Sequence, residues 1–418
     1  MIQAMYSGVS GIQAHQTRLD VVGNNIANVN TIGFKAGRVT FYDQLSQTLR
    51  GASRPQGGRG STDPLQVGLG VKVGSITAMH TQGALQQTGR PSDLAIQGNG
   101  FFLVGDGIAT SYTRDGAFTL DAEGNLVSAT TGVRLLGWRA GPDGTVDSSV
   151  PITPASNIRI PIGTMTAVKT TGTVTLAGNL DAAAAPGGTY TRTAQVYDSL
   201  GESHDVAFRL SRDAAATPPA AATWTWTTSV DGGPYSAPGG ANSGTLNFDA
   251  DGALIGAPGT VTVTPGTGAS AFTLTPQWGE VSQLSGAYSM GVTAQDGFPF
   301  GALQSYTIGE DGLVTGLFSN GLTRDLGQIA VAQFANPAGL NKVGSNLFRL
   351  SGNSGEPQIT AAGAASAGLI SAGFLEQSNV NLAEEFTSMI VTQRGFQANT
   401  RIVTASDEIL QDLLQMKR

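Results

Sequence analysis

The strongest constraint on the fold is a pair of helical patterns at the two ends of the chain, with β-type patterns between them. Near the N-terminus, apolar residues recur at steps of mostly three and four, the spacing of one face of an α-helix. They are Met5, Val9, Ile12, Leu19, Val22, Ile26 and Val29. Asn and Gly residues in the segment 30–33 favour the left-handed conformation that ends a helix, so we expect this helix to end there.

The C-terminal pattern is longer and more regular. Steps of four and three alternate without a break through Leu382, Phe386, Met389, Gln393, Phe396, Thr400, Val403, Asp407, Leu410 and Leu414. Asn379 or Asn381 is expected to cap the helix, with Glu384 and Glu385 in its first turn. Such a heptad pattern favours a partner helix. An amphipathic helix lying on a globular core is the alternative, but the terminal positions favour pairing with the other end and with other copies of the chain.

The rest of the chain predicts β-structure in several domains. Short β-prone runs recur from about residue 76 to 360, and Asp-Gly dipeptides, which favour hairpin turns, punctuate them. We therefore predict a mainly β, multi-domain protein whose antiparallel β-rich domains are flanked by terminal helices that form a coiled-coil-like inner domain. The expected parts are a helical assembly domain (1–32 plus 375–418), an irregular connector (33–75), a middle β-domain (76–164 plus 291–374) and an inserted outer β-domain (165–290).

Composition excludes several classes of protein. The chain has no cysteine, so it has neither disulfides nor thiolate metal sites. Its net charge of −7 is spread thinly and no block of Lys or Arg occurs, which argues against nucleic-acid binding. No apolar run approaches the roughly 18–20 residues that span a bilayer, so no membrane insertion is expected. The N-terminus lacks the features of a cleaved secretion signal.

Candidate catalytic and metal-binding groups are scarce. His15, His80 and His204 are far apart in the sequence, and none has a partner at metal-ligand spacing. The segment 249–252 superficially resembles a calcium loop, but its glycine comes early and no closing Glu follows, so we expect a hairpin turn. We predict no catalytic residue, no cofactor and no metal. Paired acids across a β-scaffold leave open a secreted β-rich adhesin or a carbohydrate-active protein.

Asparagines crowd the end of the N-terminal helix. Asn is unfavourable inside a helix unless its amide is used, and Asn24, Asn25 and Asn28 lie within two turns. We expect at least two of them to face a packed partner, where paired amides fix the register between helices. A simple helix-stop cluster would explain the segment 28–33 but not Asn24 and Asn25.

These terminal segments resemble the two halves of the signature of the flagellar rod and hook protein family. The N-terminal half comprises Ser7-Gly8-Val9-Ser10-Gly11, the segment from Leu19-Asp20-Val21-Val22 through Gly23-Asn24-Asn25-Ile26-Ala27-Asn28, and Gly33-Phe34-Lys35. The C-terminal half comprises Leu375-Glu376-Gln377-Ser378-Asn379-Val380 and Gln393-Arg394-Gly395-Phe396-Gln397-Ala398-Asn399. The segments 196–204 and 246–254 resemble the outer domain of the hook members, which the similar but shorter distal rod members lack.

The resemblance implies a structural subunit of the flagellar hook rather than an enzyme, with a distal rod protein of the basal body as the alternative. It implies signal-less export through the flagellar type III apparatus and assembly outside the cell into a helical tube that transmits torque from rod to filament. Implied partners are further copies of the chain and the rod, hook-cap and hook–filament junction proteins. The expected assembly interface is Val9, Ile12, Leu19, Val22, Asn24, Asn25, Ile26, Asn28, Leu382, Phe386, Met389, Gln393, Phe396, Asn399, Val403, Leu410 and Leu414.

Overall fold

The computed structural model of the 418-residue chain describes residues 2–52, 63–141, 144–160, 162–163, 166–213, 223–256, 259–266, 268–364 and 366–416. The chain forms two compact units. Unit 1 comprises Met1–Ile160, Thr307–Thr315 and Asp325–Arg418, and unit 2 comprises Pro161–Tyr306 and Gly316–Arg324. No helix in the described ranges is long and apolar enough to cross a membrane.

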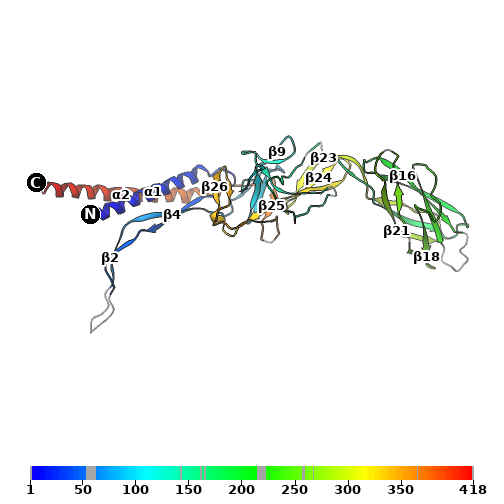
Figure 1. The fold of residues 1–418 in the computed structure, drawn as a ribbon, viewed down its shortest axis with the longest axis horizontal. Coiled ribbons are helices and arrows are strands. Elements are labelled where there is room, and N and C mark those ends of the chain that lie inside the picture. Colours follow the sequence, from blue (N-terminus) through cyan, green and yellow to red (C-terminus); the bar gives the residue numbers. More distant parts are fainter. Residues whose placement is uncertain are drawn as a thin grey trace, which may run out of the picture. The chain divides into compact units, whose positions relative to one another are not determined.

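Unit 1 contains both terminal helices, which lie side by side (Figure 1). Helix α1 is Ile2–Ala27 and helix α2 is Leu382–Gln415, so both predicted helices are confirmed. Asn381 caps α2, its side chain accepting a hydrogen bond from the backbone N–H of Ala383. After α1 the chain turns at Gly33, whose φ of +67° requires the conformational freedom of glycine.

The segment 33–75 was expected to be irregular, and this expectation is wrong. Strand β1 (Gly37–Asp43) pairs antiparallel with β4 (Val71–Ala78), and β2 (Ser46–Arg50) pairs with β3 (Leu65–Gly68). The Val, Thr, Phe and Tyr residues of β1 favour strand, which outweighed the absence of a clear period in the sequence. Residues 53–60, the Gly-rich centre of the predicted connector, lie outside the described residues.

The remaining strands of unit 1 form a β-domain. Two short strand pairs, β5–β30 and β6–β29, join the first and last segments of this domain. Its main sheet has the strand order β25–β7–β11–β10–β9. Further strands attach to this sheet, namely β8, β12, β26, β27 and β28. A cluster that includes Phe101, Tyr112, Trp138 and Phe348 forms part of its core. The bounds are β5 Leu85–Gln87, β6 Leu94–Gln97, β7 Phe101–Gly105, β8 Thr110–Thr113, β9 Phe118–Leu120, β10 Leu126–Ser128, β11 Arg134–Leu135, β12 Gly137–Arg139, β25 Thr323–Gln333, η1 Pro337–Gly339, β26 Asn341–Gly344, β27 Leu347–Arg349, β28 Gln358–Ala361, β29 Leu369–Ala372 and β30 Phe374–Glu376.

Unit 2 is built on two sheets that share one core. One sheet has the order β15–β16–β17–β18–β19 and the other β20–β21–β14–β22, and Trp224, Trp226 and Trp278 are buried in their common core. Buried and exposed residues alternate along β16, as expected of a strand that faces a core on one side. The bounds are β13 Thr166–Lys169, β14 Thr173–Asp181, β15 Thr189–Tyr197, β16 Ser203–Arg212, β17 Thr223–Val230, β18 Ser243–Phe248, β19 Leu254–Gly256, β20 Val261–Val263, β21 Phe272–Leu284, β22 Gly291–Gln295, β23 Phe298–Ile308 and β24 Leu313–Phe318.

The pairing in unit 2 is not wholly antiparallel. Strands β14 and β21 are parallel, which is possible because a long stretch of chain, including all of β15–β19, connects them. The hairpin turn expected at 249–252 is confirmed. It joins β18 to β19, and Asp249 Oδ1 accepts hydrogen bonds from the N–H groups of Asp251 and Ala253. The expected inserted domain, 165–290, falls within unit 2, and the expected helical domain falls within unit 1. The expected middle β-domain, 76–164 plus 291–374, is divided, because residues 161–164, 291–306 and 316–324 belong to unit 2.

Candidate assembly interface

Helices α1 and α2 contact each other through small residues. A Cβ added at Gly8 would lie 3.1 Å from Val403 Cγ2, and one added at Gly11 would lie 2.8 Å from the Asn399 side chain. From the other helix, a Cβ at Gly395 would lie 2.7 Å from the ring of His15. Glycines on both helices therefore let the two backbones approach closely.

The buried positions on the face that α2 turns toward α1 are polar and small, and the apolar Ile402 and Val403 lie beside Gly8. Thr392 and Ser406 are the two buried positions on the described part of α2, and they share a face with Gly395 and Asn399 because residues three and four apart lie on one side of a helix. The hydroxyls of Thr392 and Ser406 donate hydrogen bonds to carbonyls of their own helix, at 2.6 and 2.7 Å. These side chains can therefore face α1 without an unpaired polar group.

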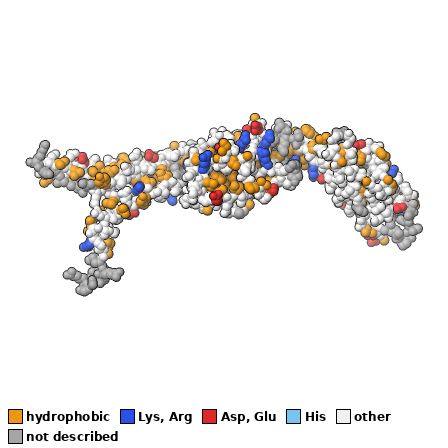
Figure 2. All heavy atoms as spheres, viewed as in Figure 1, with side chains coloured by type: hydrophobic (Ala, Val, Ile, Leu, Met, Phe, Trp, Pro, Cys, Tyr) orange, Lys and Arg blue, Asp and Glu red, His pale blue; other side chains and the backbone are white. Residues whose placement is uncertain are grey.

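The apolar side chains of α2 remain largely exposed. Phe386 is 49% exposed, Ile390 54% and Leu414 70%, although side chains of this kind are usually buried. Hydrophobic side chains are visible along the helix pair in Figure 2. The heptad stripe found in the sequence thus packs on α1 only in part within one chain. Val403 lies against Gly8, whereas Phe386 and Leu414 stay exposed.

The predicted interface residues fall into three groups. Val22 and Asn25 are buried within the chain. The exposed ones are Val9, Asn24, Leu382, Phe386, Gln393 and Leu414, and the half-buried ones are Ile12, Leu19, Ile26, Asn28, Met389, Phe396, Asn399, Val403 and Leu410.

Asn25 is the asparagine that links α1 to other elements. Its amide pairs with the backbone of Gly37 in β1, accepting from Gly37 N at 2.8 Å and donating to Gly37 O at 2.9 Å. The same Nδ2 donates to Glu385 Oε1 on α2 at 2.9 Å. Asn24 and Asn28 instead bond each other, with Asn28 Nδ2 donating to Asn24 Oδ1 at 2.7 Å. Within the described part of the chain, Asn25 is the one of the three whose amide hydrogen-bonds to another helix or strand.

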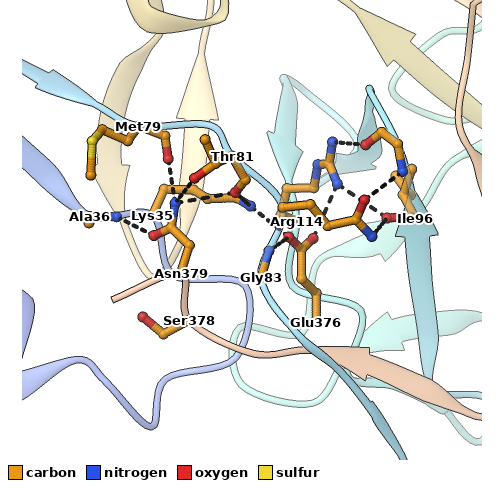
Figure 3. Close-up of polar contacts among 12 residues, drawn as sticks. Lys35, Ala36, Met79, Thr81, Gly83, Ile96, Arg114, Glu376, Ser378 and Asn379 are labelled. Carbon is orange, nitrogen blue, oxygen red and sulfur yellow. Dashed lines mark hydrogen bonds and ion pairs between the residues drawn. The ribbon is translucent and has the colours of Figure 1, made fainter. Parts of the chain in front are cut away.

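A buried charge cluster, which we call the anchor, joins the inner ends of both helices to the β-domain (Figure 3). It consists of Lys35, Arg114 and Glu376. Glu376 Oε1 accepts from Lys35 Nζ at 2.6 Å and from Gly83 N at 2.8 Å, and Oε2 accepts from Arg114 Nη1 at 3.1 Å. The three side chains are 1%, 4% and 0% exposed, respectively. Because the charges are desolvated, each depends on its partners.

Burial sets the electrostatics of the anchor. Desolvation lowers the pKa of Lys35, an effect that the Glu376 carboxylate opposes and the nearby Arg114 reinforces. Desolvation likewise lowers the pKa of Arg114, again opposed by Glu376. The carboxylate thus helps to keep two buried cations charged.

Asn379 completes the junction between α2 and the start of the β-domain. Its Oδ1 accepts from Ala36 N at 2.8 Å, and its Nδ2 donates to Met79 O at 2.7 Å and to Thr81 Oγ1 at 2.9 Å (Figure 3). Lys35, Glu376 and Asn379 all lie in the terminal motifs. No role was predicted for Lys35 or Glu376, and Asn379 was one of two candidate caps of α2, a position that Asn381 takes. The sequence did offer one signal for an ion pair: Lys35 follows the N-terminal helix and Glu376 precedes the C-terminal helix.

The β2–β3 ribbon also exposes apolar side chains. Every residue of both strands is exposed, including Leu49, Leu65 and Val67, and Leu45 just before the ribbon is 84% exposed. A two-stranded ribbon with no packed face is marginally stable in water, so this arrangement favours contact with another surface.

In the described chain, one group of residues has metal-ligand geometry, formed by Asp198, Glu202 and His204 in unit 2. The expectation that His204 has no partner at metal-ligand spacing is therefore wrong. His204 Nδ1 lies 2.7 Å from Asp231 Oδ2, and Nε2 lies 3.4 Å from Asp198 Oδ2. Burial lowers the pKa of His204, but hydrogen bonds and charge from Asp231 and Asp198 outweigh it and raise the pKa overall. The arrangement ties the β15–β16 turn to the end of β17.

Four family models match the chain. They are "Flagella basal body rod protein" over residues 5–35, "Flagellar hook protein FlgE/F/G D1 domain" over 95–176, "Flagellar basal body protein FlaE D2 domain" over 167–298 and "Flagellar basal body rod FlgEFG protein C-terminal" over 371–416. The two terminal matches cover the motifs on which the sequence resemblance rests.

Similar proteins span the whole chain. The flagellar hook protein FlgE of Borreliella burgdorferi is 42% identical over 100% of both chains, and that of Treponema pallidum is 39% identical, also over 100% of both. The flagellar basal-body rod protein FlgG of Bacillus subtilis is 32% identical over 100% of both chains. The solved flagellar hook protein FlgE2 of Helicobacter pylori has a similar fold, with a TM-score of 0.50 and 16% identity over 70% of this chain and 100% of that one.

Proposed function

Because the chain belongs to the flagellar hook protein family, we propose that its terminal helices drive polymerisation into a flexible tube that carries torque from rod to filament. As a member of this family it is a structural component of the bacterial flagellum. We assign it no catalytic residue and no cofactor. Export through the flagellar type III apparatus, and contacts with the rod, hook-cap and hook–filament junction proteins, belong to the same proposal.

The observation that carries this proposal is the uncovered apolar face of α2. Within one chain, α2 meets α1 through Gly395, Asn399 and Val403, whereas Phe386, Ile390 and Leu414 stay exposed. A surface of this kind is stabilised when a neighbouring copy covers it. If the covering surface of the neighbour differs from the covered one, and the rotation between copies does not close a ring, the contact repeats and builds a helical filament.

We assign the predicted interface residues to two kinds of contact. Val22 and Asn25 serve the fold of the single chain, because both are already buried there. The exposed and half-buried positions, above all Leu382, Phe386 and Leu414, serve contacts between copies. The coiled-coil-like inner domain expected from the heptads is accordingly a feature of the polymer, and the exposed β2–β3 ribbon is a second candidate contact.

A hook subunit is favoured over a distal rod subunit. The identity to two hook proteins, 42% and 39%, exceeds the 32% identity to the rod protein over the same full coverage. A curved, flexible polymer would agree with the hook, and a straight, rigid one would identify a rod protein. An adhesin or carbohydrate-active protein would instead bind glycans as a monomer.

Replacing Phe386 with Asp tests the role of the α2 face. Kosmotropic salt strengthens apolar burial, so we expect the purified chain to form tubes at high ammonium sulfate concentration, visible by electron microscopy. Phe386→Asp should abolish the tubes, because assembly would bury a charge between copies. It should leave the circular dichroism of the soluble chain unchanged, because Phe386 is exposed there.

Phe300→Asp is the matched control, since Phe300 is 61% exposed but lies in unit 2. We expect this variant to form normal tubes. Normal tubes from Phe386→Asp, or equal loss in both variants, would contradict the assignment of the interface to α2.

A further inference from the structure

Three side chains of the kinds that bind metal ions meet at the β15–β16 turn of unit 2. Asp198 directly follows β15, Glu202 directly precedes β16, and His204 is the second residue of β16. One ligand atom of each residue, a carboxylate oxygen or an imidazole nitrogen, lies within 4.8 Å of the other two. None of the three belongs to the assembly interface proposed above, so the group needs an explanation of its own.

Backbone hydrogen bonds fix the carboxylate of Asp198. Its Oδ1 accepts from the N–H groups of Leu200 at 2.8 Å and Glu202 at 2.9 Å. This leaves Oδ2 for another partner, and Oδ2 lies 3.4 Å from Nε2 of His204. The Asp198 side chain is 0% exposed, and a buried carboxylate is stable only when a cation or hydrogen bonds compensate its charge.

A second carboxylate orients the ring of His204. Oδ2 of Asp231 lies 2.7 Å from Nδ1 of the ring, and Oδ1 of the same carboxylate accepts from the backbone N–H of Asp205 at 2.8 Å. Histidines that bind metals usually hold a carboxylate or carbonyl with the nitrogen that does not bind the ion. This contact places the proton of the neutral imidazole on Nδ1 and leaves the Nε2 lone pair facing Asp198.

The distance of 3.4 Å between His204 Nε2 and Asp198 Oδ2 suits a shared ion better than a direct hydrogen bond. Hydrogen bonds from N–H to oxygen usually span about 2.7–3.2 Å, and those between charged groups are shorter. In a tetrahedral zinc site with bonds of about 2.0–2.1 Å, neighbouring ligand atoms lie about 3.3–3.4 Å apart. With the imidazole proton on Nδ1, Nε2 and Oδ2 are both acceptors, and a cation between them relieves their repulsion.

Glu202 supplies the third ligand and the route of entry. Its side chain is exposed, so it can rotate toward the other two ligand atoms and open the group to solvent. Calcium and magnesium prefer ligand sets made of oxygen alone, whereas one imidazole with two carboxylates suits zinc. No metal was expected from the sequence because the histidines are far apart, but the partners of His204 are carboxylates.

We propose that Asp198 Oδ2, Glu202 and His204 Nε2 bind one Zn²⁺ ion, with Asp231 as the positioning residue and water as the fourth ligand. Burial of Asp198 is compatible with this site, because the ion is smaller than a water molecule. The ion fastens the β15–β16 turn to the end of β17 through His204 and Asp231. The alternative occupant is a proton on Nε2, which would make the group an ordinary ion pair.

Calorimetric titration of the untagged, metal-free full chain with zinc chloride tests the proposal. We expect saturable binding of one Zn²⁺ per chain at pH 7. Nuclear magnetic resonance of the histidine Cε1–H signals, followed in the same titration, locates the ion. The His204 signal should change until one equivalent is bound, while the signal of His80 in unit 1 stays in place. Both measurements use the soluble chain, so this proposal and that of assembly can fail separately.

Glu202→Gln removes one ligand at an exposed position, where the fold should tolerate it. We expect it to weaken zinc binding at least about tenfold, because even changes outside the ligand set commonly have an effect of this size. Glu280→Gln is the matched control, since Glu280 is exposed on β21 in the same unit, and it should leave binding unchanged. Absence of saturable binding, or equal affinities of the two folded variants, would overturn the proposal and leave a proton on Nε2.

Discussion

Glu376 is the residue on which the junction between helices and β-domain depends most. It is fully buried, and its two oxygens take hydrogen bonds from Lys35, Arg114 and the backbone of Gly83. A buried carboxylate of this kind adds little net stability compared with apolar side chains, but removing it leaves its cations uncompensated. The anchor therefore fixes where the helices attach more than it strengthens the fold.

We predict that Glu376→Gln lowers the free energy of unfolding of unit 1 by about 3–5 kcal/mol, the usual effect of breaking a buried ion pair. Urea unfolding followed by circular dichroism at 222 nm would measure it, because both α-helices of the described chain lie in unit 1. Glu384→Gln, an exposed first-turn position of α2, should cost less than about 1 kcal/mol. Equal effects of the two substitutions would show that the anchor is dispensable.

At the scale of the secondary-structure elements, the sequence predicts whether a segment is helix or strand better than it predicts which elements pack together. The helix ends near residues 30 and 381 and the strands at Phe101–Val104, Val206–Leu210 and Thr223–Val230 could be read from periodicity, caps and Asp-Gly turns. The ribbons between 37 and 78 were missed because their apolar residues face no core and follow no clear alternation.

The contact face of α2 was also beyond the sequence pattern. Hydrophobicity selects the stripe through Phe386 and Leu414, whereas the close approach of α1 is governed by the absence of side-chain volume at Gly8, Gly11 and Gly395. Small residues carry no hydrophobic signal. For the same reason, the roles of Lys35 and Glu376 required knowing which residues lie together in space.

We predict that Gly11→Leu destabilises the helix pair by about 1–3 kcal/mol, because the new side chain must displace Asn399. Gly23→Leu is the matched control on the same helix, since no atom lies within 4 Å of a Cβ at that position. It should be neutral or stabilise α1 by up to about 1 kcal/mol, through helix propensity. Amide hydrogen exchange across α1 would compare them, and similar protection in both variants would contradict packing through small residues.

For the whole molecule, the apolar side chains that each unit exposes indicate which contacts it makes in the polymer. Unit 1 carries the terminal helices, the ribbon and the exposed apolar positions on them. Unit 2 buries three tryptophans in a core of its own between two sheets, and its exposed apolar side chains, such as Phe300, are not on a helix. We therefore expect the strong contacts of the polymer in unit 1 and weaker, more adjustable contacts in unit 2, as a joint that bends would require.

The absence of cysteine makes a direct measurement of this account possible, because one introduced thiol is the only thiol in the chain. Ile390→Cys places it on the exposed face of α2, and Ile255→Cys places it at a 67% exposed position of unit 2. Alkylation rates of both variants are measured as soluble chain and again after assembly into tubes. The account predicts that the thiol at position 390 reacts readily in the soluble chain and becomes protected in tubes, while the thiol at 255 stays reactive in both. Equal reactivity of position 390 before and after assembly would contradict the claim that the apolar face of α2 is the surface through which copies join.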